Sequence, residues 1–392
     1  MKTSSIVRKE NISTVLQIIQ SSTEVSKNTI ATRAGLSQVT VHKIVNDLIA
    51  RGICEECENV IATGGRNAAL FRINGSYGAI LGQVVRRKQL QTVAYSFSLE
   101  KLYDNVVDCN LTDMTEYLEA MIRELRTAME SISGWNILGI GVSLPGRSNA
   151  QGDIINIPGY KAWSHFPLRS VLESNLHLPV CVDNDVNALA ISVKYNQCAN
   201  KYSDYTYLQV SEGVGMGVVI DNCLFRGKYG CGCEIGHTSI MLNGPLCSCG
   251  NRGCFDAYLE DKRLLESIRT RCLAGDAPAP GTLEEAIVQA QRDANSVAAD
   301  VFRESARYVA IAIEHIYRIF NTEAVFLRCP WLAAMPELMT LITDKVFAGI
   351  AWARRDRFFI LQESDQQIQD SSAACLFMDT LFRTDALIES AQ

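Results

Sequence analysis

The chain has 392 residues, of which 47% are hydrophobic and 20% are charged. Its length suggests two or three domains, and its composition is that of an ordinary soluble globular protein. No apolar run reaches membrane-spanning length and the N-terminal segment lacks the apolar core of a signal peptide, so we expect a cytoplasmic protein without membrane insertion. In that compartment the 14 cysteines are expected as thiols or metal ligands rather than disulfides.

Charge is distributed unevenly along the chain. Residues 1–74 carry nine Lys and Arg against six Asp and Glu, or +3, which leaves −9 on the remainder of a chain whose net charge is −6. A basic N-terminal end on an acidic body is typical of proteins that contact nucleic acid through that end.

The N-terminal segment is predicted to contain three helices. Apolar residues recur at helical spacing over residues 12–19 and 41–49, and a shorter helix is predicted between Ser26, a good N-cap, and Gly35, which permits a left-handed end. Ser37 then caps the last helix, so the order is helix, tight turn, helix, as in proteins that place the second helix in a DNA major groove. The residues expected to face DNA are Ser37, Gln38, Thr40, His42 and Lys43, with Asn46 on the same exposed face.

Two strand-like stretches follow, at residues 53–56 and 69–73, with a polar segment containing Gly64 and Gly65 between them. This pattern predicts a two-stranded wing whose Arg66 enters a narrow minor groove. The alternative is a three-helix protein-interaction module with solvated charges. From residue 76 onward apolar strands alternate with helical stretches, for example a strand at 137–144 and a helix at 117–132, which indicates an α/β architecture.

A cluster of metal-ligand residues lies between residues 234 and 254. Its members are His237, Cys247, Cys249 and Cys254. One imidazole and three thiols form a closed tetrahedral set without a position for a catalytic water, so the segment predicts one structural zinc ion per chain. Unliganded buried thiols are one alternative. An iron–sulfur cluster that also recruits Cys231 and Cys233 is another.

The order Glu-x-Gly-His, nine residues, Cys-x-Cys-Gly and then Gly-Cys resembles the zinc signature of the ROK family, which contains sugar kinases and sugar-responsive repressors. Residues 36–48 also resemble the L-S-x-x-T-V-x-x-I-V-x-x-L of the DNA-binding domain that ROK repressors carry and ROK kinases lack. The resemblance implies a winged helix-turn-helix (mainly α) at residues 1–75. It also implies an α/β actin-like (ribonuclease H-like) sugar-binding domain at residues 76–392, with two lobes that meet near residue 187 and a zinc site at 237–254.

The resemblance further implies a set of sugar-binding residues. These are Asn184, Asp185, Glu234, His237 and Asp256, and His237 uses its other ring nitrogen on zinc. A carboxylate beside an amide suits the recognition of vicinal sugar hydroxyls. Asp185 matches the general base of the kinases and is interpreted as a vestige of that role. Asp256 stands where the family often has Glu, so we expect it to reach the sugar through water.

The nucleotide-binding loops that the family uses are altered at each of the three expected places. Val84 and Arg86–Lys88 replace the Asp and the Gly-Gly-Thr of the first phosphate loop, Glu212 stands in the second, and Arg328 stands where the adenosine loop has glycine. Val and Arg can neither organise magnesium nor let backbone amides approach a phosphate. We therefore expect no kinase activity.

The resemblance and the altered loops together favour a regulator similar to those that respond to xylose, N-acetylglucosamine or glucose, in particular a repressor of carbohydrate genes relieved by a sugar or sugar phosphate. Its expected partners are double-stranded operator DNA, the effector and further copies of the chain in a dimer or tetramer. Arg86, Arg87 and Lys88 favour a 6-phosphorylated effector, and a solvated charged turn is the alternative reading of these three residues. The alternative functions are a sugar kinase with a DNA-binding appendage and a regulator controlled by docking of a sugar-transport protein.

Overall fold

The computed structural model describes residues 4–61, 68–149, 151–196, 198–199, 201–350, 352, 354–361, 365–384 and 387. The chain divides into two units, one formed by Met1–Lys201 with Gln367–Gln392 and the other by Tyr202–Gln366. Within the described ranges no helix is long and apolar enough to cross a membrane.

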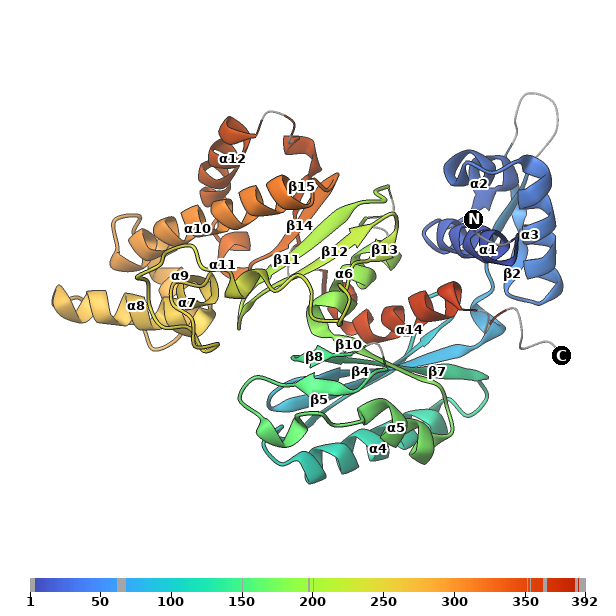
Figure 1. Ribbon diagram of the computed structural model, residues 1–392, viewed down its shortest axis with the longest axis horizontal. Coiled ribbons are helices and arrows are strands. Elements are labelled where there is room, and N and C mark those ends of the chain that lie inside the picture. Colours follow the sequence, from blue (N-terminus) through green and yellow to red (C-terminus); the bar gives the residue numbers. More distant parts are fainter. Residues whose placement is uncertain are drawn as a thin grey trace. The chain divides into compact units, whose positions relative to one another are not determined.

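The first unit begins with a small helical region (Figure 1). It contains α1 (Ser4–Gln20), β1 (Val25–Ser26), α2 (Lys27–Ala34), α3 (Gln38–Ala50), β2 (Cys54–Ile61) and β3 (Ala68–Ile73). The three strands form one antiparallel sheet in the order β1-β3-β2. The predicted helices and the two longer strands are therefore present, and β1 is an addition that the sequence pattern did not reveal.

Local chemistry explains where these helices begin and end. Ser26 and Ser37 each accept a hydrogen bond from the backbone amide three residues on, at 3.1 Å, and so cap α2 and α3. Gly35 ends α2 with φ = 63°, a conformation that glycine adopts without steric cost. The apolar faces of α1 and α3 are buried as the periodicity predicts, with Val15, Val41 and Val45 fully covered.

The rest of the first unit is built on a five-stranded sheet in the order β10-β7-β4-β5-β6. Its strands are β4 (Ala79–Val85), β5 (Gln89–Ser96), β6 (Lys101–Asp108), β7 (Ile137–Leu144) and β10 (Val180–Asn184). Its helices are α4 (Met114–Ser131), α5 (Leu168–Leu176), α6 (Asp185–Tyr195), α13 (Gln366–Asp370) and α14 (Ser372–Arg383). Between β7 and α5 lie the short strands β8 (Arg147–Ser148) and β9 (Ile154–Asn156). Figure 1 shows α4 and α5 on one face of the sheet and α14 on the other.

The C-terminal helix α14 packs unusually closely on this sheet. A Cβ added to Gly141 of β7 would overlap the Ala373 carbonyl, and one added to Gly139 would overlap the Phe377 ring. Because α6 packs against α14, both helices belong to the first unit, and the division falls at Lys201. This division lies beyond the end of α6, whereas the lobe boundary expected near residue 187 falls within that helix.

The second unit repeats the plan of the first. Its sheet has the order β13-β12-β11-β14-β15 and consists of β11 (Tyr205–Val210), β12 (Val214–Ile220), β13 (Cys223–Leu224), β14 (Ala324–Arg328) and β15 (Phe358–Ile360). Its helices are α7 (Asp256–Leu259), α8 (Asp261–Ala274), α9 (Leu283–Arg292), α10 (Val297–Ile319), α11 (Pro330–Ala333) and α12 (Leu338–Gly349). In each unit an antiparallel three-strand meander is followed by two parallel strands on its first-strand side. Two such units in one chain are the actin-like arrangement, as expected.

Candidate functional site

The predicted metal ligands come together in the second unit. His237 ends the short 3₁₀ turn Ile235–His237, and the ligand atoms of His237, Cys247, Cys249 and Cys254 all lie within 4.8 Å of one another. The loop between them is folded by the isolated bridges Ser239↔Cys254 and Leu246↔Arg252. Gly253 adopts φ = 69°, and a Cβ there would overlap the Met241 carbonyl, so only glycine fits this turn.

The spacing of these atoms fits a tetrahedral metal. The sulfurs of Cys249 and Cys254 are 3.8 Å apart, and the Cys247 sulfur lies 3.7 Å from Nδ1 of His237. Zinc–sulfur bonds of about 2.3 Å in a tetrahedron place two sulfurs about 3.8 Å apart. Cys247 and Cys254 are buried, whereas Cys249 is exposed, so a cation among them would be shielded from water on one side only. The cluster can therefore hold one metal ion.

Cys231 and Cys233 do not join the cluster. Their thiols instead donate to the carbonyl oxygens of Tyr229 and Phe225, at 3.6 and 3.7 Å. Within the described ranges the ligand set is thus one imidazole and three thiols, and the five-thiol arrangement considered for an iron–sulfur cluster is not assembled.

Two expected sugar-binding residues flank this cluster. Nε2 of His237 lies 4.0 Å from a carboxylate oxygen of Glu234, on the ring edge opposite the thiols. Asp256 places one carboxylate oxygen 3.6 Å from Nδ1 of His237. The other oxygen accepts a hydrogen bond from the Val214 amide at 2.8 Å, so Asp256 ties the metal loop to the start of β12.

The other two expected sugar-binding residues belong to the first unit. Asn184 ends β10 and caps α6, since its Oδ1 accepts from the amides of Val186 and Asn187. Its side-chain nitrogen donates to the Gly146 carbonyl at 3.0 Å and to the Asp185 carboxylate at 2.9 Å. Both amide hydrogens of Asn184 are thereby used inside the protein. Asn184 consequently orients Asp185, a role that the motif alone did not indicate.

Comparison with known proteins decides the family, because the profile of the ROK family matches residues 87–348. The chain belongs to the ROK family. A xylose repressor from Caldicellulosiruptor bescii is 29% identical over 335 residues, which are 82% of this chain and 83% of the relative. A glucokinase from Streptomyces coelicolor is 28% identical over 218 residues, which are 53% of this chain and 69% of the relative. A solved ROK family transcriptional regulator, a homolog of the E. coli MLC protein, has a TM-score of 0.78 at 20% identity and covers 98% of this chain and 100% of its own.

In this ROK chain the first expected phosphate loop is a closed turn between β4 and β5. The Arg86 amide donates to the Gln89 carbonyl at 2.9 Å, and the Tyr117 hydroxyl lies within hydrogen-bond distance of the same turn. The Arg86 side chain donates to Gln91 at 3.1 Å, and the Arg87 guanidinium lies 5.7 Å from the Tyr160 ring centre. Arg86 and Arg87 therefore have partners within the unit, although Arg87 and Lys88 are exposed.

The second expected loop is the turn between β11 and β12, where Glu212 is exposed. Asp261, which the sequence reading missed, lies next to it and donates its amide to the Ser211 carbonyl at 2.9 Å. Burial, with the charge of Glu212 as a second cause, raises the pKa of Asp261 to about 6. Two carboxylates therefore lie close together at the turn where the second phosphate loop was expected.

The N-terminal region of this ROK chain presents a polar face on α3. Gln38, His42 and Lys43 are exposed, while Thr40 is half-buried and shares a hydrogen bond with the Ser37 hydroxyl at 2.8 Å. Two residues of this surface escaped the sequence reading: Val39, which is 66% exposed, and Lys27, which donates to Asn46 at 2.8 Å. Arg66 lies outside the described residues.

Proposed function

We propose that the chain is a sugar-responsive transcriptional regulator, and specifically a repressor. The observation that carries this proposal is the combination of a helical N-terminal region, exposing polar side chains on α3, with a ROK body whose first phosphate loop is closed by its own hydrogen bonds. The likeness to a xylose repressor over most of both chains supports it.

In this proposal α2, α3 and the β2–β3 hairpin form a winged helix-turn-helix, and α3 lies in the major groove. Lys43 contacts phosphate, while Gln38 reads a base edge and the exposed Val39 meets a thymine methyl group. Ser37, Thr40 and His42 set the N-terminal end of the helix on the DNA backbone. Arg66 of the wing completes the set as a minor-groove contact.

The proposed effector residues are Asn184 and Asp185 in the first unit and Glu234, His237 and Asp256 in the second. Asn184 acts by orienting the Asp185 carboxylate, and Asp256 acts by holding His237 and β12 together. Arg86 donates to Gln91 and Arg87 lies over Tyr160, which leaves the exposed Lys88 alone to favour a 6-phosphorylated sugar. We therefore propose an unphosphorylated sugar, with xylose as the first to test.

The proposed metal is structural zinc, held by His237 Nδ1 and the thiolates of Cys247, Cys249 and Cys254. When bound, the ion would supply rigidity rather than reactivity, because four protein ligands fill its coordination sphere. His237 would then be fixed in orientation with Nε2 turned toward Glu234.

The proposed route of coupling is α6. This helix starts at the Asn184 cap and extends over about 16 Å to Lys194, a buried residue whose ammonium group donates to Gln17 of α1 at 3.1 Å. The helix is held along its length, since Ser192 donates to the Ile368 carbonyl and Tyr195 donates to Asp379 of α14. A change at Asp185 would therefore reach the DNA-binding region through a stiff element rather than a loop.

The rival function is a sugar kinase with a DNA-binding appendage, favoured by Asp185 and by the likeness to a glucokinase. Incubation of the purified chain with magnesium, ATP and a panel of pentoses and hexoses tests it. We expect no sugar phosphate above the level of an Asp185→Ala control. Phosphorylation that the control lacks would replace our proposal with the kinase. Docking of a sugar-transport protein would instead appear as effector-independent loss of DNA binding when that protein is added.

A further inference from the structure

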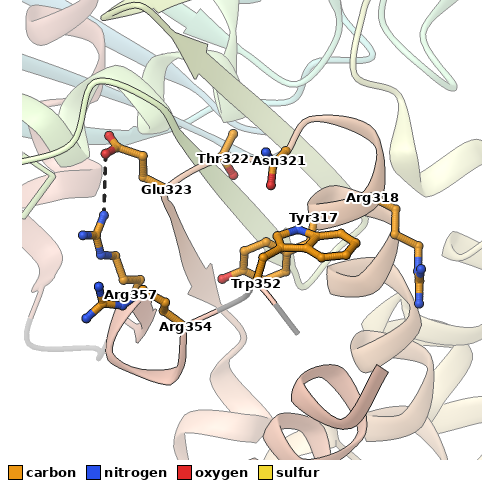
Figure 2. A pocket seen from close by; sticks show the side chains of 8 residues that line it. All are labelled: Tyr317, Arg318, Asn321, Thr322, Glu323, Trp352, Arg354 and Arg357. Atoms are coloured by element: carbon orange, nitrogen blue, oxygen red, sulfur yellow. Dashed lines mark ion pairs between the residues drawn. The ribbon is translucent and has the colours of Figure 1, made fainter. Parts of the chain in front are cut away.

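A pocket of ≈570 Å³ lies in the second unit, away from the metal centre and from the effector residues of that unit. It is lined by the end of α10, by the residues that lead into β14 and by the segment before β15 (Figure 2). Its lining residues are Tyr317, Arg318, Asn321, Thr322, Glu323, Trp352, Arg354 and Arg357. Its volume lies within the range of about 300–1,000 Å³ that small-molecule sites occupy.

The position of the pocket separates it from the expected phosphate and effector positions of this unit. Thr322 and Glu323 precede β14, whereas Arg328 ends it, so the pocket lies at the opposite end of a strand about 16 Å long. β11 runs parallel to β14, and Asp256 bonds Val214, which pairs with the last residue of β11. The pocket and Asp256 therefore lie at opposite ends of the strands of one sheet.

Two aromatic rings line the pocket. Trp352 is 58% exposed, a large apolar area to leave in water. Tyr317 is 3% exposed, and within the described part of the chain its buried hydroxyl has no hydrogen-bond partner. Burial raises the pKa of Tyr317 to about 12, so the hydroxyl keeps its proton near neutral pH and can donate it. The exposed indole of Trp352 offers a face on which a planar ring can stack.

Three guanidinium groups surround these rings, as Figure 2 shows. Arg318 donates to the Gly349 carbonyl at 3.2 Å, and Arg357 lies 3.5 Å from Glu323. The Glu323 carboxylate also accepts from the Ser203 amide at 2.9 Å, so it belongs to the framework. Arg354 pairs with Asp356, but both side chains are more than 60% exposed, and such a pair exchanges readily for another anion.

We propose that this pocket binds a nucleoside monophosphate, with the base stacked on Trp352 and the phosphate held by the arginines. Stacking on an exposed indole suits a planar base, and the guanidinium fork matches the oxygen spacing of a phosphate. Asn321, at φ = 50° in a left-handed conformation that Asn tolerates, is exposed and offers its amide group for the base edge or the ribose, whereas the buried Thr322 hydroxyl is bonded to Thr206 and to the Ala324 carbonyl.

Isothermal calorimetry on the full chain, with quenching of Trp fluorescence as a second readout, tests the proposal. The probes are AMP, GMP, CMP and UMP, with adenosine, ribose 5-phosphate, inorganic phosphate and benzoate as partial ligands. At least one nucleotide should bind about 10-fold tighter than each partial ligand. Trp352→Ala and Arg318→Gln should each weaken it about 10-fold, and Tyr317→Phe should weaken it less. Arg307→Gln, which changes an exposed arginine earlier on α10, should leave it unchanged.

Nucleotide binding that survives Trp352→Ala would overturn the proposal, as would equal affinities for AMP and benzoate or the absence of binding by every nucleotide. Asp185→Ala should leave nucleotide binding intact, and Trp352→Ala should leave sugar and DNA binding intact. The nucleotide-binding proposal and the regulatory function are therefore tested by separate measurements, and either can be rejected without the other.

Discussion

Lys43 is the exposed lysine of α3 and can contact a DNA phosphate. The neighbouring Lys27 of α2 instead donates a hydrogen bond to Asn46. We expect Lys43→Ala to weaken binding to specific and random DNA alike, by about 5- to 10-fold, and to reduce the salt slope of log K by about 1. Fluorescence anisotropy at several salt concentrations measures both. Lys345→Ala, a change at an exposed lysine of α12, is the matched control. Equal salt slopes for the two variants would remove Lys43 from the interface.

Asp261 is a carboxyl group that weakens the fold at neutral pH. Its folded pKa of about 6 lies above the ordinary 3.8, so its contribution to stability is fully present below pH 3.8 and is lost as the pH rises through 6. Asp261→Asn has no charge to bury and should raise the free energy of unfolding by about 1–2 kcal/mol at pH 8, with the gain fading toward pH 4. Urea titrations at both pH values test this. Asp300→Asn, at an exposed first-turn position of α10, should give no such pH-dependent gain.

At the scale of single residues, the sequence predicted those side chains whose contacts lie within a few residues along the chain. Ser26 and Ser37 as caps, and the exposed set on α3 apart from the half-buried Thr40, followed from residue type and spacing. The sequence could not predict that the hydrogen bonds of Asn184 are spent on Gly146 and Asp185, or that Asp261 is buried beside Glu212. Those facts depend on contacts between segments far apart in the chain.

The metal loop is an element whose order should depend on its ion. Binding of the metal and folding of such a loop are coupled, so the free energy of metal binding contributes to the stability of the fold. Cys249→Ser should reduce the zinc content from one per chain to near zero and lower Tm on the order of 5 °C. Cys231→Ser, which keeps a donor to the Tyr229 carbonyl, should change neither quantity. Elemental analysis that finds iron, or full stability without any metal, would contradict the zinc proposal.

Helix α6 should carry the effector signal, and the Lys194–Gln17 hydrogen bond is where it meets α1. Lys194→Met keeps the length of the side chain and removes its ammonium group. We expect sugar affinity to stay within about 2-fold while the effect of sugar on DNA affinity falls several-fold. A double-mutant cycle with Gln17→Leu isolates the pair. If sugar lowers DNA affinity equally in all four proteins, α6 is not the route.

Among elements, long periodic stretches were predicted best. The strand expected at 137–144 is β7, and the helix expected at 117–132 is α4, which begins three residues earlier because Asp113 caps it. The placement of α14 could not be predicted. It packs on β7, from which it is separated by more than two hundred residues in the sequence, at the place where Gly139 and Gly141 leave room for it. Together with α6 it belongs to the first unit, which extends to Lys201.

At the scale of the whole molecule, we propose that one chain links sugar recognition to DNA affinity. Linkage requires the effect to be reciprocal: a sugar that weakens DNA binding by a given factor must itself bind more weakly, by that same factor, to the DNA complex. The ROK family membership is shown by the match over residues 87–348, whereas the proposal that the chain represses transcription rests on its likeness to xylose repressors.

The most direct test begins with genomic fragments enriched by the full-length protein at physiological salt. Their affinity is then measured by anisotropy with and without xylose and a panel of other sugars. We predict an inverted repeat with half-sites separated by whole helical turns, bound at least about 1,000-fold tighter than random DNA, and an affinity that one unphosphorylated sugar lowers at least 10-fold. Equal binding of random and enriched DNA would contradict the account. So would a DNA affinity that no sugar changes in the wild type and that Asp185→Ala also leaves unchanged.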